Sequence, residues 1–115
     1  METITLNGKT YYSEKETAPA SQYKIFRGDR SGVFFGLLRE QSEDGKRCLI
    51  ENARRIWYWE GAASLSQLAQ SGTSKPEKCK FPEPVNEIEL TDVIEIISVT
   101  ENAKKIIDEV PVWKH

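Results

Sequence analysis

The residues with the clearest chemical potential lie in one stretch, residues 51–65, which combines two adjacent arginines with three aromatic side chains, Arg54, Arg55, Trp57, Tyr58 and Trp59. A guanidinium group binds a phosphate or carboxylate through two parallel hydrogen bonds. An aromatic face stacks on a nucleobase or another flat ring. The stretch therefore predicts a binding site for a nucleotide-like ligand. Core packing is the alternative, because these aromatic residues favour strands and arginine commonly lies across an aromatic ring for structural reasons.

A second group of cationic side chains belongs to the loop at residues 27–32, which contains Arg27 and Arg30 together with two glycines. Backbone N–H groups of such a loop can bind an anion. Both arginines are therefore added to the predicted ligand site, from a neighbouring loop or subunit. The loop lacks the glycine-rich phosphate-loop pattern that ends in Gly-Lys-Ser or Gly-Lys-Thr. A plain hairpin loop is the favoured alternative, since glycine and aspartate are common in turns.

The sequence offers little to catalysis. The only histidine, His115, is the last residue, so no Ser-His-Asp or Cys-His combination can be assembled in the interior. The acidic residues Glu87, Glu89 and Glu95 are spaced like the solvated face of a strand. Nothing near them marks one carboxyl for the raised pKa that a hydrolase needs. We therefore expect a protein that is not an enzyme and uses no cofactor.

Composition indicates a single soluble domain. The chain has 115 residues, with 16 basic and 18 acidic side chains and a net charge of -2. Dedicated DNA-binding domains are usually basic, so a nucleic-acid partner is disfavoured. Cys48 and Cys79 lack metal-ligand spacing and are expected to be free thiols. Neither a signal peptide nor an apolar run of about 20 residues is visible, which predicts a cytoplasmic protein without membrane contact.

The elements that would position the site are indicated by turns and by hydrophobic periodicity. Asn7-Gly8 predicts a two-residue hairpin turn. Residues 42–45 predict a second turn, in which Asp44-Gly45 fits a hairpin that pairs residues 33–40 with residues 46–58. The predicted elements of the single domain, residues 1–115, are a hairpin at 2–12, central strands at 22–60, a short helix at 62–71, one or two strands at 86–99 and a helix at 101–109.

The two helices are predicted from their caps. Ser64 followed by Gln67 forms a capping box, and Thr100 is a good N-cap for the second helix. Lys104 and Lys105 are expected on the outer face of that second helix. The apolar end of the chain, residues 112–113, is expected to dock back on the domain. The sum predicts an α+β fold, either a mostly antiparallel sheet or a small partly open barrel, with six to seven strands and two short helices.

Arg54 and Arg55 cannot share a face of a regular strand, because successive side chains point to opposite faces. One of them is expected to face inward, where a charge needs an anionic partner or a bound ligand. Glu51 or Glu60 could supply that partner internally. The segment at residues 52–53 is predicted to contain a β-bulge, which would re-aim the side chains that follow. Gly36, in the facing strand, indicates a bulge or a close backbone approach.

The motif NARRIWYWxGAASL at residues 52–65 is followed by KPxxCKF at residues 75–81 and by VIEII at residues 93–97. Together they resemble a family of small, uncharacterised phage and prophage proteins over about residues 22–113. The resemblance implies a setting, the cytoplasm of a bacterial host during infection. Small phage proteins of this size are often counter-defence factors. The Thoeris anti-defence sponges, which sequester a cyclic ADP-ribose isomer, are a candidate relative, and none of their ligand residues is transferred to this chain.

The resulting hypothesis is a non-enzymatic phage counter-defence protein that binds and sequesters a phosphorylated, cyclic nucleotide immune signal, as a homo-oligomer. The alternative is an inhibitor or adaptor that binds a host defence protein through the same aromatic and arginine residues. Binding of single-stranded nucleic acid is a third possibility. The acidic net charge disfavours it.

Overall fold

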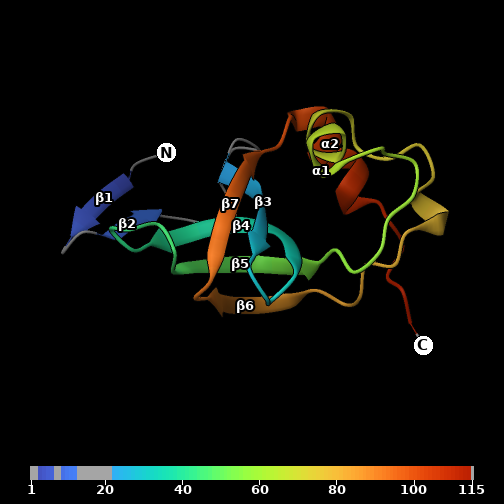
Figure 1. Ribbon diagram of the computed structural model, residues 1–115. Coiled ribbons are helices and arrows are strands. Elements are labelled where there is room, and N and C mark those ends of the chain that lie inside the picture. The colour runs from blue at the N-terminus through green and yellow to red at the C-terminus, as the bar shows by residue number, and fades with distance from the viewer. Residues whose placement is uncertain (1–2, 7–8, 13–21, 115) are drawn as a thin grey trace.

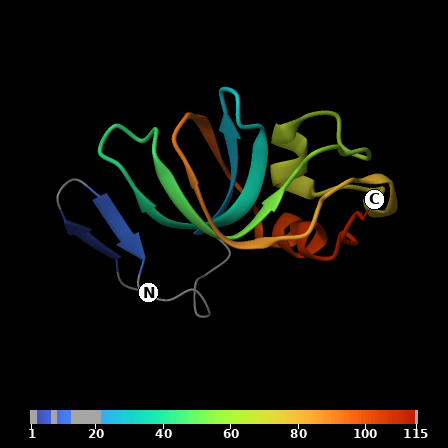
Figure 2. The ribbon, with the colours of Figure 1, turned by 90° about the horizontal axis from the view of Figure 1, so that it is seen from below.

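The fold is built on a strongly curved antiparallel sheet (Figures 1 and 2). In the computed structural model, residues 3–6, 9–12 and 22–114 are described. The main sheet has the strand order β7-β3-β4-β5-β6. Its strands are β3 (Tyr23–Gly28), β4 (Val33–Gln41), β5 (Cys48–Arg55), β6 (Val85–Leu90) and β7 (Val93–Ser98). The predicted α+β class with a mostly antiparallel sheet is confirmed.

The sheet is open and does not close into a barrel. Its edge strands β6 and β7 follow one another in the sequence, yet among the described strands β6 pairs with β5 and β7 pairs with β3. The main sheet has five strands, slightly fewer than the six to seven predicted. A hairpin of β1 (Thr3–Leu6) and β2 (Lys9–Tyr12) extends it beside the end of β4. The predicted Asn7-Gly8 turn of that hairpin lies outside the described residues.

Both faces of the main sheet are covered, which explains the unbroken apolar run in β4. Phe35 and Leu37 point to one face and pack with residues of the helices. Phe34 and Leu38 point to the other face and pack with strand residues only. That second cluster includes Leu90 of one edge strand and Val93 of the other, and only a curved sheet can bring its two edges together on one face. A strand buried on both faces has no alternation of polar and apolar residues.

The two helices, α1 (Leu65–Ser71) and α2 (Glu101–Asp108), lie side by side at one end of the sheet (Figure 1). The predicted caps are present: the Ser64 hydroxyl accepts a hydrogen bond from Gln67 N, and the Thr100 hydroxyl accepts one from Ala103 N. The Thr100 hydroxyl also donates to the Gln70 carbonyl oxygen at 2.8 Å, which ties one helix to the other. A short 3-10 helix, η2 (Pro76–Lys78), lies between α1 and β6. Among the described residues, no helix has the length and apolar character needed to cross a membrane.

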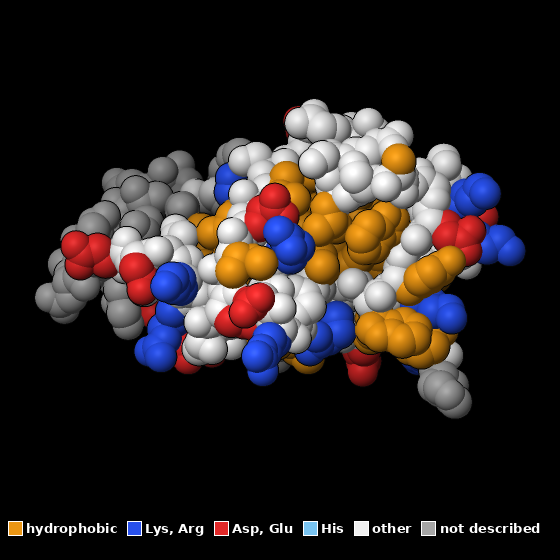
Figure 3. All heavy atoms as spheres, viewed as in Figure 1, with side chains coloured by type: hydrophobic (Ala, Val, Ile, Leu, Met, Phe, Trp, Pro, Cys, Tyr) orange, Lys and Arg blue, Asp and Glu red, His pale blue; other side chains and the backbone are white. Residues whose placement is uncertain are grey.

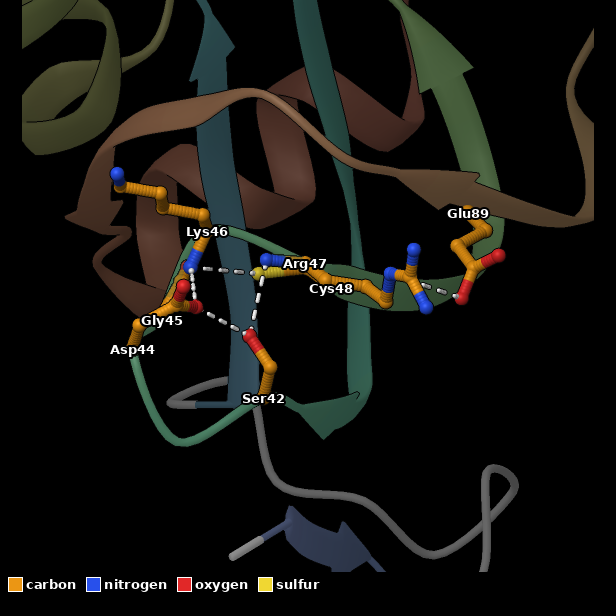
Figure 4. Close-up of polar contacts among 7 residues, drawn as sticks. All are labelled: Ser42, Asp44, Gly45, Lys46, Arg47, Cys48 and Glu89. Atoms are coloured by element: carbon orange, nitrogen blue, oxygen red, sulfur yellow. Dashed lines mark hydrogen bonds and ion pairs between the residues drawn. The ribbon is translucent and has the colours of Figure 1, made fainter.

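The turn between β4 and β5 is held by its own polar side chains (Figure 4). The Asp44 carboxylate accepts hydrogen bonds from the Ser42 hydroxyl at 2.7 Å and from Lys46 N at 3.0 Å. Gly45 has a φ of 82°, a left-handed conformation that favours glycine. Gly45 N donates to the Ser42 carbonyl oxygen at 2.9 Å, so the predicted turn at residues 42–45 is confirmed. All of these contacts are local, so a sequence pattern can reveal them.

β5 ends at Arg55, whereas the sequence predicted a strand through residue 58. Ile56 N still donates to the Val33 carbonyl oxygen at 2.8 Å, but Val33 is the first residue of β4, so the partner strand stops there. Beyond that point Tyr58 forms only an isolated antiparallel bridge with Lys80. The aromatic residues that follow Arg55 consequently belong to a connecting segment.

The predicted bulge in β5 is confirmed, and it determines which arginine faces the helices. In the β4–β5 register, Gly36 lies opposite two residues, Asn52 and Ala53. Asn52 has a φ of 50°, and a Cβ atom at Gly36 would lie 3.0 Å from the Glu51 carbonyl oxygen. The extra residue reverses the alternation of side chains along the strand. As a result Arg54 points to the helix face of the sheet.

Candidate functional site

Arg54 is the buried member of the arginine pair, with 7% of its surface exposed. Its guanidinium donates to the carbonyl oxygens of Ile107 at 3.0 Å and Val110 at 2.6 Å, both at the C-terminal end of α2. It also donates to the Phe81 carbonyl oxygen at 3.4 Å and lies 5.3 Å from the centre of the Phe81 ring. The last carbonyls of a helix lack partners within the helix, and a positive charge there is favourable. Arg54 therefore fastens the end of α2 to the sheet.

The partner of the buried arginine differs from the acidic residues that the sequence suggested. Glu51 forms an ion pair with Arg39 at 3.5 Å, and Glu60 accepts a hydrogen bond from the Tyr58 hydroxyl at 2.8 Å. Burial lowers the pKa of Arg54 below its ordinary value, and the negative charge of Asp108 partly opposes that shift. The Nε atom of Arg54 is buried without a hydrogen-bond partner among the described residues. The guanidinium therefore has capacity for one further acceptor.

An open pocket of about 440 Å³ lies beside Arg54, between the sheet and α2. Small-molecule sites in proteins commonly have volumes of about 300 to 1,000 Å³. The pocket is lined by Tyr23, Phe35, Asn52, Arg54, Pro84, Lys104, Asp108, Val110 and Val112. These residues come from β3, β4, β5, α2 and two connecting segments. The bulge in β5 thus supplies two of the polar members, Asn52 and Arg54.

One wall of the pocket is aromatic, and its polar groups are ordered by hydrogen bonds. The rings of Tyr23 and Phe35 stack with their centres 5.5 Å apart. The Asn52 side-chain amide donates to the Tyr23 hydroxyl oxygen at 3.1 Å. Lys104 Nζ lies 4.3 Å from the centre of the Tyr23 ring and donates to the Asp108 carboxylate at 2.6 Å. Two cationic side chains and one carboxylate give the lining a net charge of about +1 at neutral pH.

The aromatic and arginine residues of the predicted ligand site do not converge in one place. Arg55 lies 4.3 Å from the centre of the Phe34 ring, on the face opposite Arg54, and donates to the Ser31 carbonyl oxygen at 2.8 Å. Trp59 is half-buried against the helix-side core, and its indole N–H donates to the Ala62 carbonyl oxygen at 3.2 Å. The structure thus places Arg54 in the pocket and Arg55 outside it.

The other two aromatic residues of that motif are exposed and lie near the end of the chain. The ring of Trp57 stacks on that of Trp113, with centres 5.1 Å apart and planes 15° apart. Lys80 Nζ lies between 5.4 and 5.7 Å from the ring centres of Trp57, Tyr58 and Trp113. The predicted docking of residues 112–113 back on the domain is therefore confirmed.

The loop between β3 and β4 does bind an anion through its backbone, and that anion is part of the protein. The Asp92 carboxylate accepts hydrogen bonds from Arg30 N at 2.8 Å, from Ser31 N at 3.0 Å and from the Ser31 hydroxyl at 2.7 Å. The side chain of Arg27 forms an ion pair with Glu95 at 2.8 Å. Arg27 and Arg30 are not among the residues that line the pocket.

This internal contact predicts a dependence of stability on pH. The hydrogen bonds from Arg30 N and the Ser31 hydroxyl hold the pKa of Asp92 below its ordinary value. The ionised carboxylate therefore stabilises the folded state at neutral pH, and the stabilisation is lost as the pH falls through the folded-state pKa. Asp92→Asn is expected to lower the urea midpoint at pH 7, and its difference from the unsubstituted protein should shrink below about pH 4.

Asp29→Asn is the matched control, because Asp29 contributes its backbone N–H, which donates to the Asp92 carbonyl oxygen at 2.8 Å. Its effect on the urea midpoint should be small at both pH values. Equal midpoints for Asp92→Asn and Asp29→Asn at pH 7 would show that the Asp92 carboxylate does not hold the loop.

Several pocket residues were missed by sequence reasoning. Lys104, predicted on the outer face of α2, has 24% of its side chain exposed and reaches over Tyr23. Asp108 lies one helical turn further on, and the spacing of the two did permit an ion pair. Tyr23 carried no signal apart from its place in a short strand. Asn52 was singled out only as a bulge residue, and of the predicted ligand residues Arg54 is the one that lines the pocket.

The fold and the site define a class: an α+β protein with a cationic, aromatic-walled pocket between its sheet and its C-terminal helix. Across the described residues, no cluster of His, Cys, Asp and Glu could hold a metal ion. The family model described as a domain of unknown function, DUF6948, matches residues 21–107, and the chain belongs to that family. Comparisons with curated proteins and with solved structures give no match.

Proposed function

We propose that this protein is a non-enzymatic binding protein whose pocket takes a flat anionic ligand of the phosphorylated nucleotide class. The observation that carries the proposal is the composition of the pocket. A stacked pair of aromatic rings faces the interior beside two cationic side chains, with one carboxylate to balance them. An anionic ligand would complete that balance of charge, and a buried charge without such a balance is costly.

Each part of a nucleotide has a matching group in the pocket. A flat base would lie against the edge of the aromatic wall, because the Tyr23 and Phe35 rings stack on each other and Lys104 lies over the Tyr23 ring. The Tyr23 hydroxyl oxygen accepts a hydrogen bond from Asn52, which leaves its own proton for an acceptor on the base. A phosphate fits beside Lys104 and Arg54, whose positively charged side chains both line the pocket.

The pocket is better suited to holding a ligand than to converting it chemically. Its only carboxylate among the lining residues, Asp108, is paired with Lys104 at 2.6 Å. A hydrolase of the usual kind needs two carboxyl groups or a carboxyl and another acid or base free to act, whereas the single carboxylate of the described lining is held in that ion pair. In the phage setting that the resemblance implies, tight binding without turnover would deplete a host immune signal. That counter-defence role and the homo-oligomer stay predictions.

The proposal is tested by calorimetric titration with Lys104→Ala and Lys105→Ala as matched variants. The ligands are cyclic dinucleotides, cyclic ADP-ribose isomers and ADP-ribose. Adenosine and inorganic phosphate are the controls, because they represent the nucleoside part and the phosphate part of a nucleotide. Lys104→Ala should weaken nucleotide binding by about 10-fold or more, because a charge-assisted hydrogen bond is lost and Asp108 is left unpaired. Lys105, which is exposed on the same helix, should contribute less than about 2-fold.

Two results would count against the proposal. The first is the absence of binding by every nucleotide to protein whose circular dichroism shows it to be folded. The second is an equal loss of affinity in the two lysine variants, which would indicate a diffuse electrostatic effect and no contact in the pocket. Native mass spectrometry of the same samples reports the oligomeric state and any retained ligand.

A further inference from the structure

The end of the chain forms part of the pocket wall. We define the C-terminal strap as residues 110–114. Val112 of the strap lines the pocket and forms a parallel bridge with Phe81. The next residue, Trp113, donates its backbone N–H to the Phe81 carbonyl oxygen at 2.9 Å. The strap therefore lies along residue 81 and closes one side of the space in which a ligand would sit.

The two ends of the strap are held very differently. Val110 is buried, and its carbonyl oxygen accepts the 2.6 Å hydrogen bond from Arg54. Val112 is 41% exposed and Pro111, between them, is exposed as well. Beyond this point the side chain of Trp113 stacks on Trp57. The strap thus has a fixed root at Val110, and its outer part is held by the backbone contact with residue 81 and by the Trp57–Trp113 stack.

The contact at the tip lies on the protein surface. Trp57 is 58% exposed, although it stacks on Trp113 and has Lys80 Nζ 5.5 Å from its ring centre. Figure 3 shows hydrophobic side chains gathered next to the C-terminal end of the chain, with basic side chains beside them. A stack that is open to water stabilises a segment only modestly. Segments with few buried contacts are the first to open in a folded protein.

We propose that the C-terminal strap is a gate of the pocket, with its hinge at Pro111 and the Trp57–Trp113 stack as its latch. The ligand enters and leaves when the latch opens, and the strap closes over it afterwards. The gating of a ligand rests on the proposed function, whereas the opening of the latch does not. The proposal also accounts for the exposed aromatic part of the sequence motif, which contributes no side chain to the pocket lining.

The latch is tested without any ligand by amide hydrogen exchange, followed by NMR. Trp57→Ala removes the stacking partner, and exchange of the Trp113 amide should accelerate by about 3- to 10-fold while amides in β4 keep their rates. Ile94→Ala is the matched control, because Ile94 is 55% exposed in β7. It should leave Trp113 exchange unchanged. Trp113→Ala is a second variant, in which the amide of residue 113 should show the same acceleration.

The gate is tested with the nucleotide that binds most tightly in the calorimetric titrations. Its dissociation rate, measured by stopped-flow displacement, should rise several-fold in Trp57→Ala and stay unchanged in Ile94→Ala. Unchanged Trp113 exchange in Trp57→Ala overturns the latch. Faster exchange with an unchanged dissociation rate overturns the gate. If no nucleotide binds the unsubstituted protein, the proposed function fails and the gate fails with it, while the exchange rates still decide the latch.

Discussion

Replacing Arg54 with methionine is expected to destabilise the protein by about 3 kcal/mol, because it removes hydrogen bonds from a charged donor and leaves the buried Val110 carbonyl oxygen without a partner, which alone costs about 1 to 3 kcal/mol. The guanidinium donates to three carbonyl oxygens, those of Phe81, Ile107 and Val110. The Phe81 oxygen also accepts from Trp113 N at 2.9 Å and the Ile107 oxygen from Val110 N at 3.2 Å, so the Val110 oxygen depends most on Arg54. Methionine has a similar length and fills most of the volume, so the loss reports the hydrogen bonds and the charge more than a cavity. The measurement is urea unfolding followed by circular dichroism at pH 7.

Arg55→Met is the control for this prediction, since it changes the same residue type one position along the chain. Arg55 is exposed, lies over Phe34 and donates to a single carbonyl oxygen. Its loss should cost less than about 1 kcal/mol, as is usual for exposed cationic side chains. Arg54→Lys keeps the charge without the fork of donors and should recover part of the stability. Equal destabilisation by Arg54→Met and Arg55→Met would show that the clamp on α2 contributes little.

The second large effect is expected at Gly61, where alanine should cost about 3 kcal/mol through backbone strain and steric overlap together. Gly61 has a φ of 85°. A Cβ atom there would lie 2.8 Å from Ser74 N and closer still to Lys75 N and the Thr73 hydroxyl. The Gly61 carbonyl oxygen also accepts from Ser74 N at 3.1 Å. Relief of the overlap would require this backbone contact to separate, which loosens the segment that leads from β5 into α1.

Gly45→Ala separates the cost of backbone strain from the cost of steric overlap. Gly45 has nearly the same backbone angle, with a φ of 82°, but the nearest atom to its added Cβ is Gln41 Nε2 at 3.3 Å, the end of a flexible side chain. Its alanine variant should therefore lose about 1 kcal/mol, the strain alone. Thermal unfolding of the two variants gives the difference directly. Similar melting temperatures would mean that the chain around Gly61 adjusts without loss of its contacts.

Local signals in the sequence were sufficient for turns, caps and the bulge. The turn at residues 42–45, the Ser64 and Thr100 caps and the Asn52-Ala53 bulge each depend on atoms a few positions apart or on one special backbone conformation. The end of β5 could not be predicted in the same way. It depends on where β4 begins, which is a property of the partner strand and of the turn before it.

The pocket depended on contacts that no local pattern records. Arg54 binds carbonyl groups 27, 53 and 56 positions away in the sequence. Every residue has a backbone carbonyl oxygen, so the sequence cannot indicate which of them accept a hydrogen bond from Arg54. Lys104 reaches the pocket because α2 packs through Ala103 and Ile107 in the same core cluster as Tyr23, which leaves Lys104 over the Tyr23 ring.

The sequence by itself determined that the motif at residues 52–59 would contain one buried arginine and one exposed arginine, because neighbours on a strand face opposite ways. It also determined the bulge that breaks the alternation. Only the tertiary structure decided that the buried member is Arg54, that its partners are the carbonyl oxygens at the end of α2, and that Trp57 faces Trp113. The reason is that the alternation of side chains along a strand and the structural preferences of residues are local properties of the sequence. The partner of a buried charge depends instead on the packing of segments that meet only after folding.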